Sequence, residues 1–295
     1  MAAVVRAKAS VTNSLRRNNK LAYFLLAPGL LWLAIFFVAP ILTLVSTSTK
    51  VPGMGIGEFD QAWRWANYWD ALVATRAQFF RSFIFATIAT LIALAIAYPL
   101  AYGIAFKSGK YKNILLVLVV APFFCSFILR VIAWKQILGQ EGPLFRLLLD
   151  LHLVSASTRL TATAGAVVIG LAYNFLPFMT LPLYSSLERI DPRTLEASGD
   201  LYANAWTTFR KVTLPLSMPG VVAGTLLTFI PATGDFVNAE ILGNPGTTML
   251  GNVINAQFLN TLNYPLAATL SFILMIAILI IVSVYIRRSG TEELV

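Results

Sequence analysis

The chain has 295 residues, of which 58 % are hydrophobic and only 12 % are charged, and its mean hydropathy is +0.75. Because soluble domains carry about 25 % charged residues, this composition excludes an ordinary soluble protein and indicates a membrane protein. The formal net charge of +9 does not indicate nucleic-acid binding, since the basic residues flank apolar runs and no recognition motif is present.

Six apolar segments are long enough to cross a membrane, which takes about 20 mainly apolar residues for a ~30 Å hydrocarbon core. In chain order they are 22–46, 82–106, 113–137, 163–186, 217–234 and 264–286. The first segment is too long and too Pro-interrupted for a signal-peptide core, so we expect it to be retained. The fifth is short, and Pro231 and Gly234 favour a break at its far end. The prediction is an all-α polytopic bundle of six transmembrane helices.

Two features inside these spans call for a structural explanation. Arg130 lies in the third span, where we expect it to pair with a carboxylate or to extend outward toward the interface. Gly220 and Gly224 are spaced as in a close-packing motif for membrane helices, and we interpret them as structural.

The charges between the spans predict the orientation. Basic residues concentrate in cytoplasmic loops, and the stretch from Val212 to Ile286 has none. Most of the 22 Lys and Arg residues fall in the segments 1–21, 107–112, 187–216 and 287–295. We therefore expect both termini to be cytoplasmic, with an N-terminal segment 1–21, a transmembrane domain 22–286 and a tail 287–295.

The loop 187–216 is predicted to contain a solvated helix between two long apolar runs. Asp191 suits an N-cap and Pro192 suits the first helical position. Glu196 then lies in the first turns, where its charge is favourable to the helix dipole. Such a helix outside the lipid is a natural contact for a soluble partner.

No motif of the chain indicates an enzyme. The phosphate-binding string G-x-x-x-x-G-K followed by Ser or Thr does not occur. The single histidine, His152, leaves no Ser-His-Asp triad and no zinc-spaced pair, and the single cysteine, Cys125, excludes a disulfide within the chain. We expect no cofactor on this chain, so that if ATP drives transport, ATP and magnesium bind to a partner subunit.

The loop resembles the EAA loop of the permease subunits of ATP-binding-cassette importers, whose pattern is E-A-A, three residues, G, nine residues, I, one residue, L-P. Glu196, Ala197 and Ser198 take the first triplet, and Leu214 with Pro215 closes the pattern at the same spacing. Two departures are Ser198 in place of alanine and Tyr202 in place of glycine. The resemblance implies that the loop contacts an ATPase through Glu196, Ala197, Ser198, Asp200, Leu201, Tyr202, Leu214 and Pro215.

The resemblance extends along nearly the whole chain to the B-component permeases of spermidine/putrescine importers. The segments that carry it are 126–134, 173–179, 183–188 and 229–237. It implies a type I importer permease of the bacterial inner or plasma membrane, in contact with lipid. It also implies a second homologous permease, an ATPase dimer and an external solute-binding protein.

A pathway for polyamines should offer carboxylates and aromatic faces to their ammonium groups. Asp235 and Glu240 are the only acidic residues between Val212 and Ile286. The remaining candidates for lining the pathway are Trp134, Tyr173 and Asn174. Three alternatives stay open: the same fold importing an opine, iron, sulfate or phosphonate; an ATPase-independent secondary transporter or channel; and a membrane scaffold.

Overall fold

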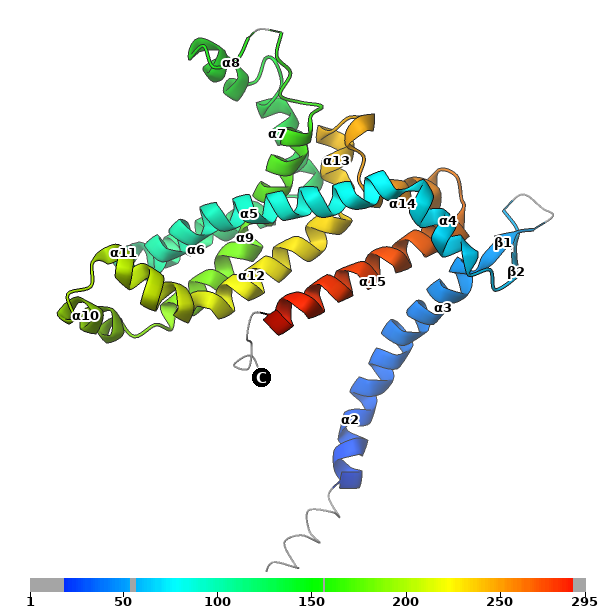
Figure 1. The fold of residues 1–295 in the computed structure, drawn as a ribbon, viewed down its shortest axis with the longest axis horizontal. Coiled ribbons are helices and arrows are strands. Elements are labelled where there is room, and N and C mark those ends of the chain that lie inside the picture. Colours follow the sequence, from blue (N-terminus) through cyan, green and yellow to red (C-terminus); the bar gives the residue numbers. More distant parts are fainter. Residues whose placement is uncertain (1–18, 54–56, 156, 289–295) are drawn as a thin grey trace, which may run out of the picture.

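The computed structural model describes residues 19–53, 57–155 and 157–288, and it consists of helices and one small sheet (Figure 1). The sheet is an antiparallel pair, β1 (Lys50–Pro52) and β2 (Phe59–Gln61). The helices that begin before the loop 187–216 are α2 (Asn19–Leu33), η1 (Ala34–Val38), α3 (Ala39–Ser48), α4 (Ala66–Ala74), α5 (Arg76–Phe106), η2 (Gly109–Tyr111), α6 (Lys112–Val120), η3 (Ala121–Phe124), α7 (Phe127–Ile137), α8 (Pro143–Asp150) and α9 (Ala164–Glu188). Those that follow are α10 (Pro192–Asp200), α11 (Ala205–Thr208), η4 (Phe209–Thr213), α12 (Leu214–Gly234), α13 (Val237–Leu242), η5 (Pro245–Thr247), α14 (Leu250–Leu259) and α15 (Tyr264–Arg288).

Within the described residues, five helical stretches are long and apolar enough to cross a membrane: Tyr23–Ser48, Arg76–Phe106, Ala164–Glu188, Ala205–Gly234 and Tyr264–Arg288. The predicted third span is not a straight helix. Gly109–Phe124 and Phe127–Ile137 meet at an angle of 96°, and they make a sixth span if the bent pair is counted as one. The helix stops because Cys125 and Ser126 have extended ψ angles of 149° and 138°, directly after the turn that contains Pro122.

The fifth span is longer than the predicted 217–234. A helix runs from Ala205 through a π-helical turn at Phe209–Thr213 to Gly234. Of the two residues expected to favour a break at its far end, Pro231 lies within the helix and Gly234 is its last residue. A proline removes a single helical hydrogen bond, and packing of α12 against α9 and α5 offsets that loss. The helix ends where Asp235 adopts an extended conformation.

Small residues bring α5, α9 and α12 close together in the core. Five alanines of α5 recur every three or four residues and are fully buried: Ala86, Ala89, Ala93, Ala97 and Ala101. On α12, a Cβ atom added at Gly220 would lie 2.7 Å from the carbonyl oxygen of Pro182, and one added at Gly224 would lie 2.9 Å from that of Met179. The predicted packing role of the two glycines is confirmed.

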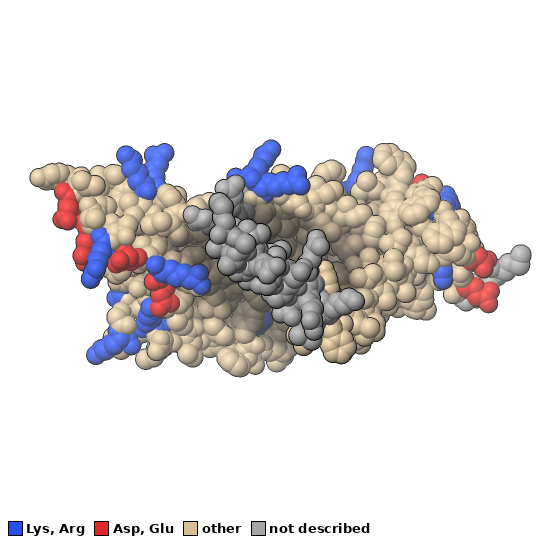
Figure 2. Space-filling model, turned by 90° about the horizontal axis from the view of Figure 1, so that it is seen from below, with Lys and Arg blue, Asp and Glu red and all other residues tan. Residues whose placement is uncertain are grey.

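The long helices α5, α12 and α15 run roughly side by side along the molecule (Figure 1). Helices α10 and α11 lie at one end, and α4 and the sheet lie at the other. Helix α2 projects from the bundle, and no residue in the most apolar 18-residue stretch of Tyr23–Ser48 is buried. Figure 2 shows that the acidic side chains on the viewed face gather at the two ends of the long axis, as expected if a membrane surrounds the middle.

Candidate functional site

The loop between α9 and α12 folds as predicted at its start. The Asp191 carboxylate accepts a hydrogen bond from the backbone N–H of Arg193 at 2.9 Å, and Pro192 is the first residue of α10. The cap satisfies a backbone N–H that the first turn of a helix leaves without an intrahelical partner. Helix α10 therefore has a defined beginning despite its nine-residue length.

Ser198 ties the two short helices of the loop together. Its hydroxyl lies 2.7 Å from the carbonyl oxygen of Leu195 and 2.8 Å from the hydroxyl of Thr208 on α11, and its side chain is buried. Asn204 caps α11 by accepting a hydrogen bond from the backbone N–H of Thr207 at 2.8 Å. An alanine in place of Ser198 would lack the bond to Thr208, so this departure from the family pattern has a local role.

Tyr202 adopts the left-handed backbone conformation for which the family pattern supplies glycine. Its φ is +58°, its N–H donates to Gly199 O at 2.9 Å, and the next N–H, of Ala203, donates to Ser198 O at 3.1 Å. The tight turn that ends α10 is thus retained with tyrosine. A left-handed conformation costs a residue with a side chain roughly 1–2 kcal/mol, and the Tyr202 side chain is 99 % exposed, with no packing inside the chain that offsets this cost.

Two replacements of Tyr202 should distinguish the contribution of the left-handed turn from that of the tyrosine side chain. Tyr202→Gly should keep the turn and remove the left-handed strain, whereas Tyr202→Val should strain it further because a β-branched residue is a poor fit at positive φ. We expect the glycine variant to retain ATPase binding better than the valine variant, as measured by co-purification from membranes. Equal retention by both variants would contradict the importance of the turn.

Six of the exposed residues of the loop are grouped here under the name coupling patch: Glu196, Ala197, Asp200, Leu201, Tyr202 and Trp206. Leu201 is 81 % and Trp206 is 67 % exposed, which is unusual for large apolar side chains outside an interface. Leu214 and Pro215 do not belong to this patch. They lie in the first turn of α12, where Leu214 is half-buried.

A chain of aromatic and hydroxyl contacts connects the coupling patch to the core. The ring of Trp206 stacks on Phe209 at 5.5 Å, and Phe209 packs edge-on against Tyr98 of α5 at the same centroid distance. The Tyr98 hydroxyl forms a hydrogen bond of 2.7 Å with the hydroxyl of Ser217 on α12. These contacts join the patch to the two core helices α5 and α12.

A second polar feature surrounds α13. Asn174 of α9 donates to Gly170 O and to the Asn238 Oδ1, both at 3.0 Å. Asn238 in turn donates to Asp235 Oδ1 from its backbone at 2.8 Å and from its side chain at 3.2 Å. All three side chains are buried, and Asn174 Oδ1 has no hydrogen-bond partner among the described residues.

Asp235 is therefore a buried residue that caps α13. Its position near the end of a span also allowed a solvated loop carboxylate, and its burial excludes that alternative. Burial, partly offset by the two hydrogen bonds from Asn238, raises the pKa of Asp235 to about 6. Asn238 was missed by the sequence reasoning. Its signal was an amide three residues after the acid, in an otherwise apolar segment.

The remaining pathway candidates lie on elements that contact α13 or belong to it. Trp134 of α7 packs edge-on against Tyr173 of α9, with ring centroids 5.3 Å apart, and both are half-buried. Glu240 of α13 is exposed and accepts a hydrogen bond of 3.0 Å from the side chain of Asn252 on α14. The five predicted residues thus lie on α13, just before it, or on the helices α7 and α9 that contact it. No group of three or more His, Cys, Asp and Glu side chains within the described chain could hold a metal ion.

Arg130 has a different environment from the one predicted. It forms no ion pair with any described residue, and its guanidinium lies over the rings of Phe123 and Phe127, at 4.8 and 5.5 Å from their centroids. Its Nε and Nη1 atoms are buried without hydrogen-bond partners in the described chain. The bend of the third span brings the two phenylalanines to opposite sides of the break, where they stabilise the cation through their ring faces.

Comparison with known proteins identifies the family. Residues 83–289 match the profile of the binding-protein-dependent transport system inner membrane component. The spermidine/putrescine transport system permease protein PotB of Haemophilus influenzae is 38 % identical over 274 residues, which cover 92 % of this chain and 95 % of that protein. PotB of Escherichia coli is 39 % identical over 69 % of this chain and 74 % of its own length, and the inner membrane ABC transporter permease protein YdcU of the same species is 31 % identical over 94 % and 92 %.

Solved structures share the fold at low sequence identity. The crystal structure of a bacterial ABC transporter that imports the acidic polysaccharide alginate contains a chain that is 17 % identical, with a TM-score of 0.68, covering 96 % of this chain and 99 % of that one. An inward-facing structure of the MetNI methionine ABC transporter contains a chain that is 18 % identical, with a TM-score of 0.56, over 75 % of this chain and 95 % of that one. The fold is that of type I importer permeases.

Proposed function

Because this chain belongs to the family of binding-protein-dependent transport system inner membrane components, we propose that it is half of the translocation pathway of an ATP-driven polyamine importer. A member of this family is a permease and not itself an enzyme. The assignment of polyamines as the solute rests on the likeness to a spermidine/putrescine permease along nearly the full length of both chains. The alginate and methionine transporters share only the fold with this chain, so they do not bear on its solute.

The coupling patch supports docking onto an ATPase of another chain, which would bind ATP and magnesium. Leu201 and Tyr202 project from the end of α10 as apolar groups for a groove, and Glu196 offers a carboxylate for a polar or ionic contact beside them. Ala197 allows close approach, Ser198 holds α10 to α11, and Leu214 with Pro215 sets the entry into α12. In this arrangement the loop, both termini and the ATPase are cytoplasmic.

The expected partners are a second homologous permease, an ATPase dimer and an external solute-binding protein. Closure of the ATPase dimer on ATP would draw the two coupling patches together, and nucleotide would shift the equilibrium because it binds one state more tightly. The contacts from Trp206 through Phe209 to Tyr98 and Ser217 would carry that movement into α5 and α12. The spans would then alternate between inward-facing and outward-facing arrangements.

The region around α13 supplies the groups that a polyamine pathway needs. Glu240 is an exposed carboxylate, the half-buried rings of Trp134 and Tyr173 offer faces for cation–π contact, and no basic residue occurs from Val212 to Ile286. Asp235 and Asn174 belong to the buried hydrogen-bonded chain through Asn238, which holds α13 against α9. We assign Glu240 to direct contact with an ammonium group and Asp235 to the negative potential of the site.

Asp235→Asn should lower polyamine uptake several-fold without loss of assembly. An asparagine keeps the oxygen that accepts from Asn238 but removes the negative charge, so the cap of α13 persists while the attraction for a cation falls. Initial rates of labelled spermidine uptake, together with the amount of complex in the membrane, measure both effects. Asp150→Asn, an exposed carboxylate on α8, is the matched control. Unchanged uptake kinetics in Asp235→Asn would remove this residue from the pathway.

A further inference from the structure

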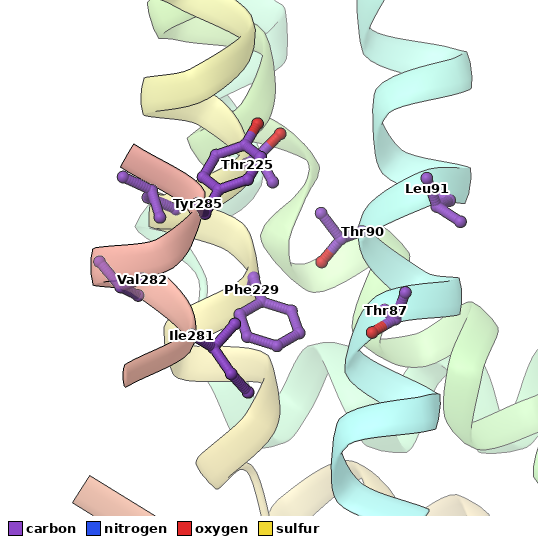
Figure 3. Close-up of a pocket in the computed structure, with 9 residues that line it drawn as sticks. Thr87, Thr90, Leu91, Thr225, Phe229, Ile281, Val282 and Tyr285 are labelled. Atoms are coloured by element: carbon purple, nitrogen blue, oxygen red, sulfur yellow. The ribbon is translucent and has the colours of Figure 1, made fainter. Parts of the chain in front are cut away.

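A crevice of about 200 Å³ opens between α5, α12 and α15, apart from the region around α13. Figure 3 shows Thr87 and Thr90 of α5 facing Phe229 of α12 and Ile281 of α15 across this space. Thr225 and Tyr285 border it at the side of α12 and α15. All three helices belong to candidate membrane spans, so the crevice lies where lipid chains surround the protein.

The lining of the crevice suits an apolar occupant. The hydroxyls of Thr87 and Thr90 donate to carbonyl oxygens of their own helix, those of Phe83 and Ala86, both at 2.7 Å. Their hydrogen-bonding capacity as donors is therefore used within α5, and their methyl groups remain for packing. No acidic residue lines the crevice, so it offers a polyamine none of the carboxylates that its ammonium groups need.

Two cations follow the crevice-lining residue Tyr285 on α15. Arg287 and Arg288 occupy the last turn of that helix, two and three residues beyond Tyr285, and both are exposed. Neither guanidinium forms an ion pair with a described residue. Basic groups at the membrane boundary beside a gap between spans are suited to the phosphate of a lipid headgroup.

We propose that the crevice binds an acyl chain of an anionic phospholipid whose phosphate contacts Arg287 and Arg288. Apolar walls at membrane depth, and cations at one boundary that form no ion pair within residues 19–53, 57–155 and 157–288, match the two parts of such a lipid. The bound chain would fill the gap between α15 and the pair α5 and α12, and so would hold α15 against the core. The proposal does not depend on which solute is carried.

The test uses the assembled transporter in phosphatidylcholine vesicles that contain a trace of phosphatidylglycerol with a photoreactive diazirine in its acyl chain. We expect labelled peptides from α5, α12 and α15 around the crevice. Arg287→Ala combined with Arg288→Ala should lower this labelling at least fivefold, and so should Thr225→Phe, which fills the crevice from a half-buried position. Lys107→Ala combined with Lys110→Ala removes two exposed cations elsewhere and should leave the labelling unchanged.

Three results would overturn the proposal. Labelling that is insensitive to both the arginine and the Thr225 variants would show that the lipid is not bound in the crevice. Equal labelling by a phosphatidylcholine probe with the same photoreactive chain would remove the role of the anionic headgroup. A photocrosslink from a benzoylphenylalanine at position 225 to the second permease would make the crevice a subunit interface. Spermidine uptake is not a readout here, so failure of the polyamine assignment would leave the lipid result intact.

Discussion

Gly220→Leu is expected to abolish uptake. Even a Cβ atom at this position would lie 2.7 Å from the carbonyl oxygen of Pro182 and 2.7 Å from the Cβ of Ser186, so α12 and α9 must separate to admit a larger side chain. Inserting extra atoms into a well-packed core costs typically about 1–3 kcal/mol, and here the obstacle is partly backbone. We expect the uptake rate and the amount of assembled complex to fall at least tenfold, as measured by transport assays and by quantifying the complex from membranes.

Gly103→Leu is the matched control. A Cβ atom added at Gly103 would have no atom of a neighbouring helix within 4 Å, whereas one at Gly220 would collide with α9. It changes the same residue type to the same side chain within another membrane helix, α5. We expect it to leave assembly near the wild-type level. Wild-type assembly and uptake in Gly220→Leu would contradict the close packing of α9 and α12.

Glu196→Lys should uncouple the permease from its ATPase. Glu196 is an exposed residue of α10 and belongs to the coupling patch, so its replacement should leave the packing of the chain unchanged and reverse one charge of the proposed docking surface. We expect uptake to fall at least tenfold while the chain still accumulates in the membrane, and co-purification of the ATPase should fall with it. The two measurements together separate lost docking from lost folding.

Glu141→Lys reverses the charge of an exposed residue between α7 and α8, outside the loop, and serves as the control for Glu196→Lys. We expect it to retain both uptake and ATPase binding. Wild-type uptake together with full retention of the ATPase in Glu196→Lys would refute the role of Glu196 in coupling.

The sequence predicted the spans well and their shapes less well. Hydropathy sums the contributions of side chains over a window, so it locates the apolar runs of α5, α9 and α15 within a few residues. It is insensitive to the backbone angles of individual residues, so it missed the 96° bend at Cys125 and Ser126. It also missed the extension of the fifth span back to Ala205, because the first turns of that helix are polar.

The local structure of the candidate sites was predictable where the signal was local. Asp191 and Pro192 begin α10 as their types require, whereas the contact of Glu196 to Pro215 with an ATPase stays a prediction. The contacts of Asn238 with Asn174 and Asp235 join residues up to 64 positions apart, and no local pattern encodes them. The sequence marked Tyr202 only as a departure from the glycine of the family pattern, and it does not show that the left-handed turn persists without glycine.

The predictions for the ends of the chain concern mainly residues 1–18 and 289–295, which lie outside the described residues. The N-terminal segment 1–21 and the tail 287–295 carry part of the charge pattern that predicts cytoplasmic termini, and that orientation stays a prediction. Protease protection of tags at either end in oriented membrane vesicles measures it directly.

Uptake of labelled spermidine in cells with and without this gene tests the central claim most directly, with competition by unlabelled putrescine, an iron chelate and an opine. The strain should lack any other polyamine importer, so that uptake reports on this permease. We expect deletion to abolish uptake, the gene to restore it, and putrescine alone among the three to compete. Spermidine uptake that is unchanged by deletion, or competition by the iron chelate or the opine, would contradict the assignment of polyamines as the solute.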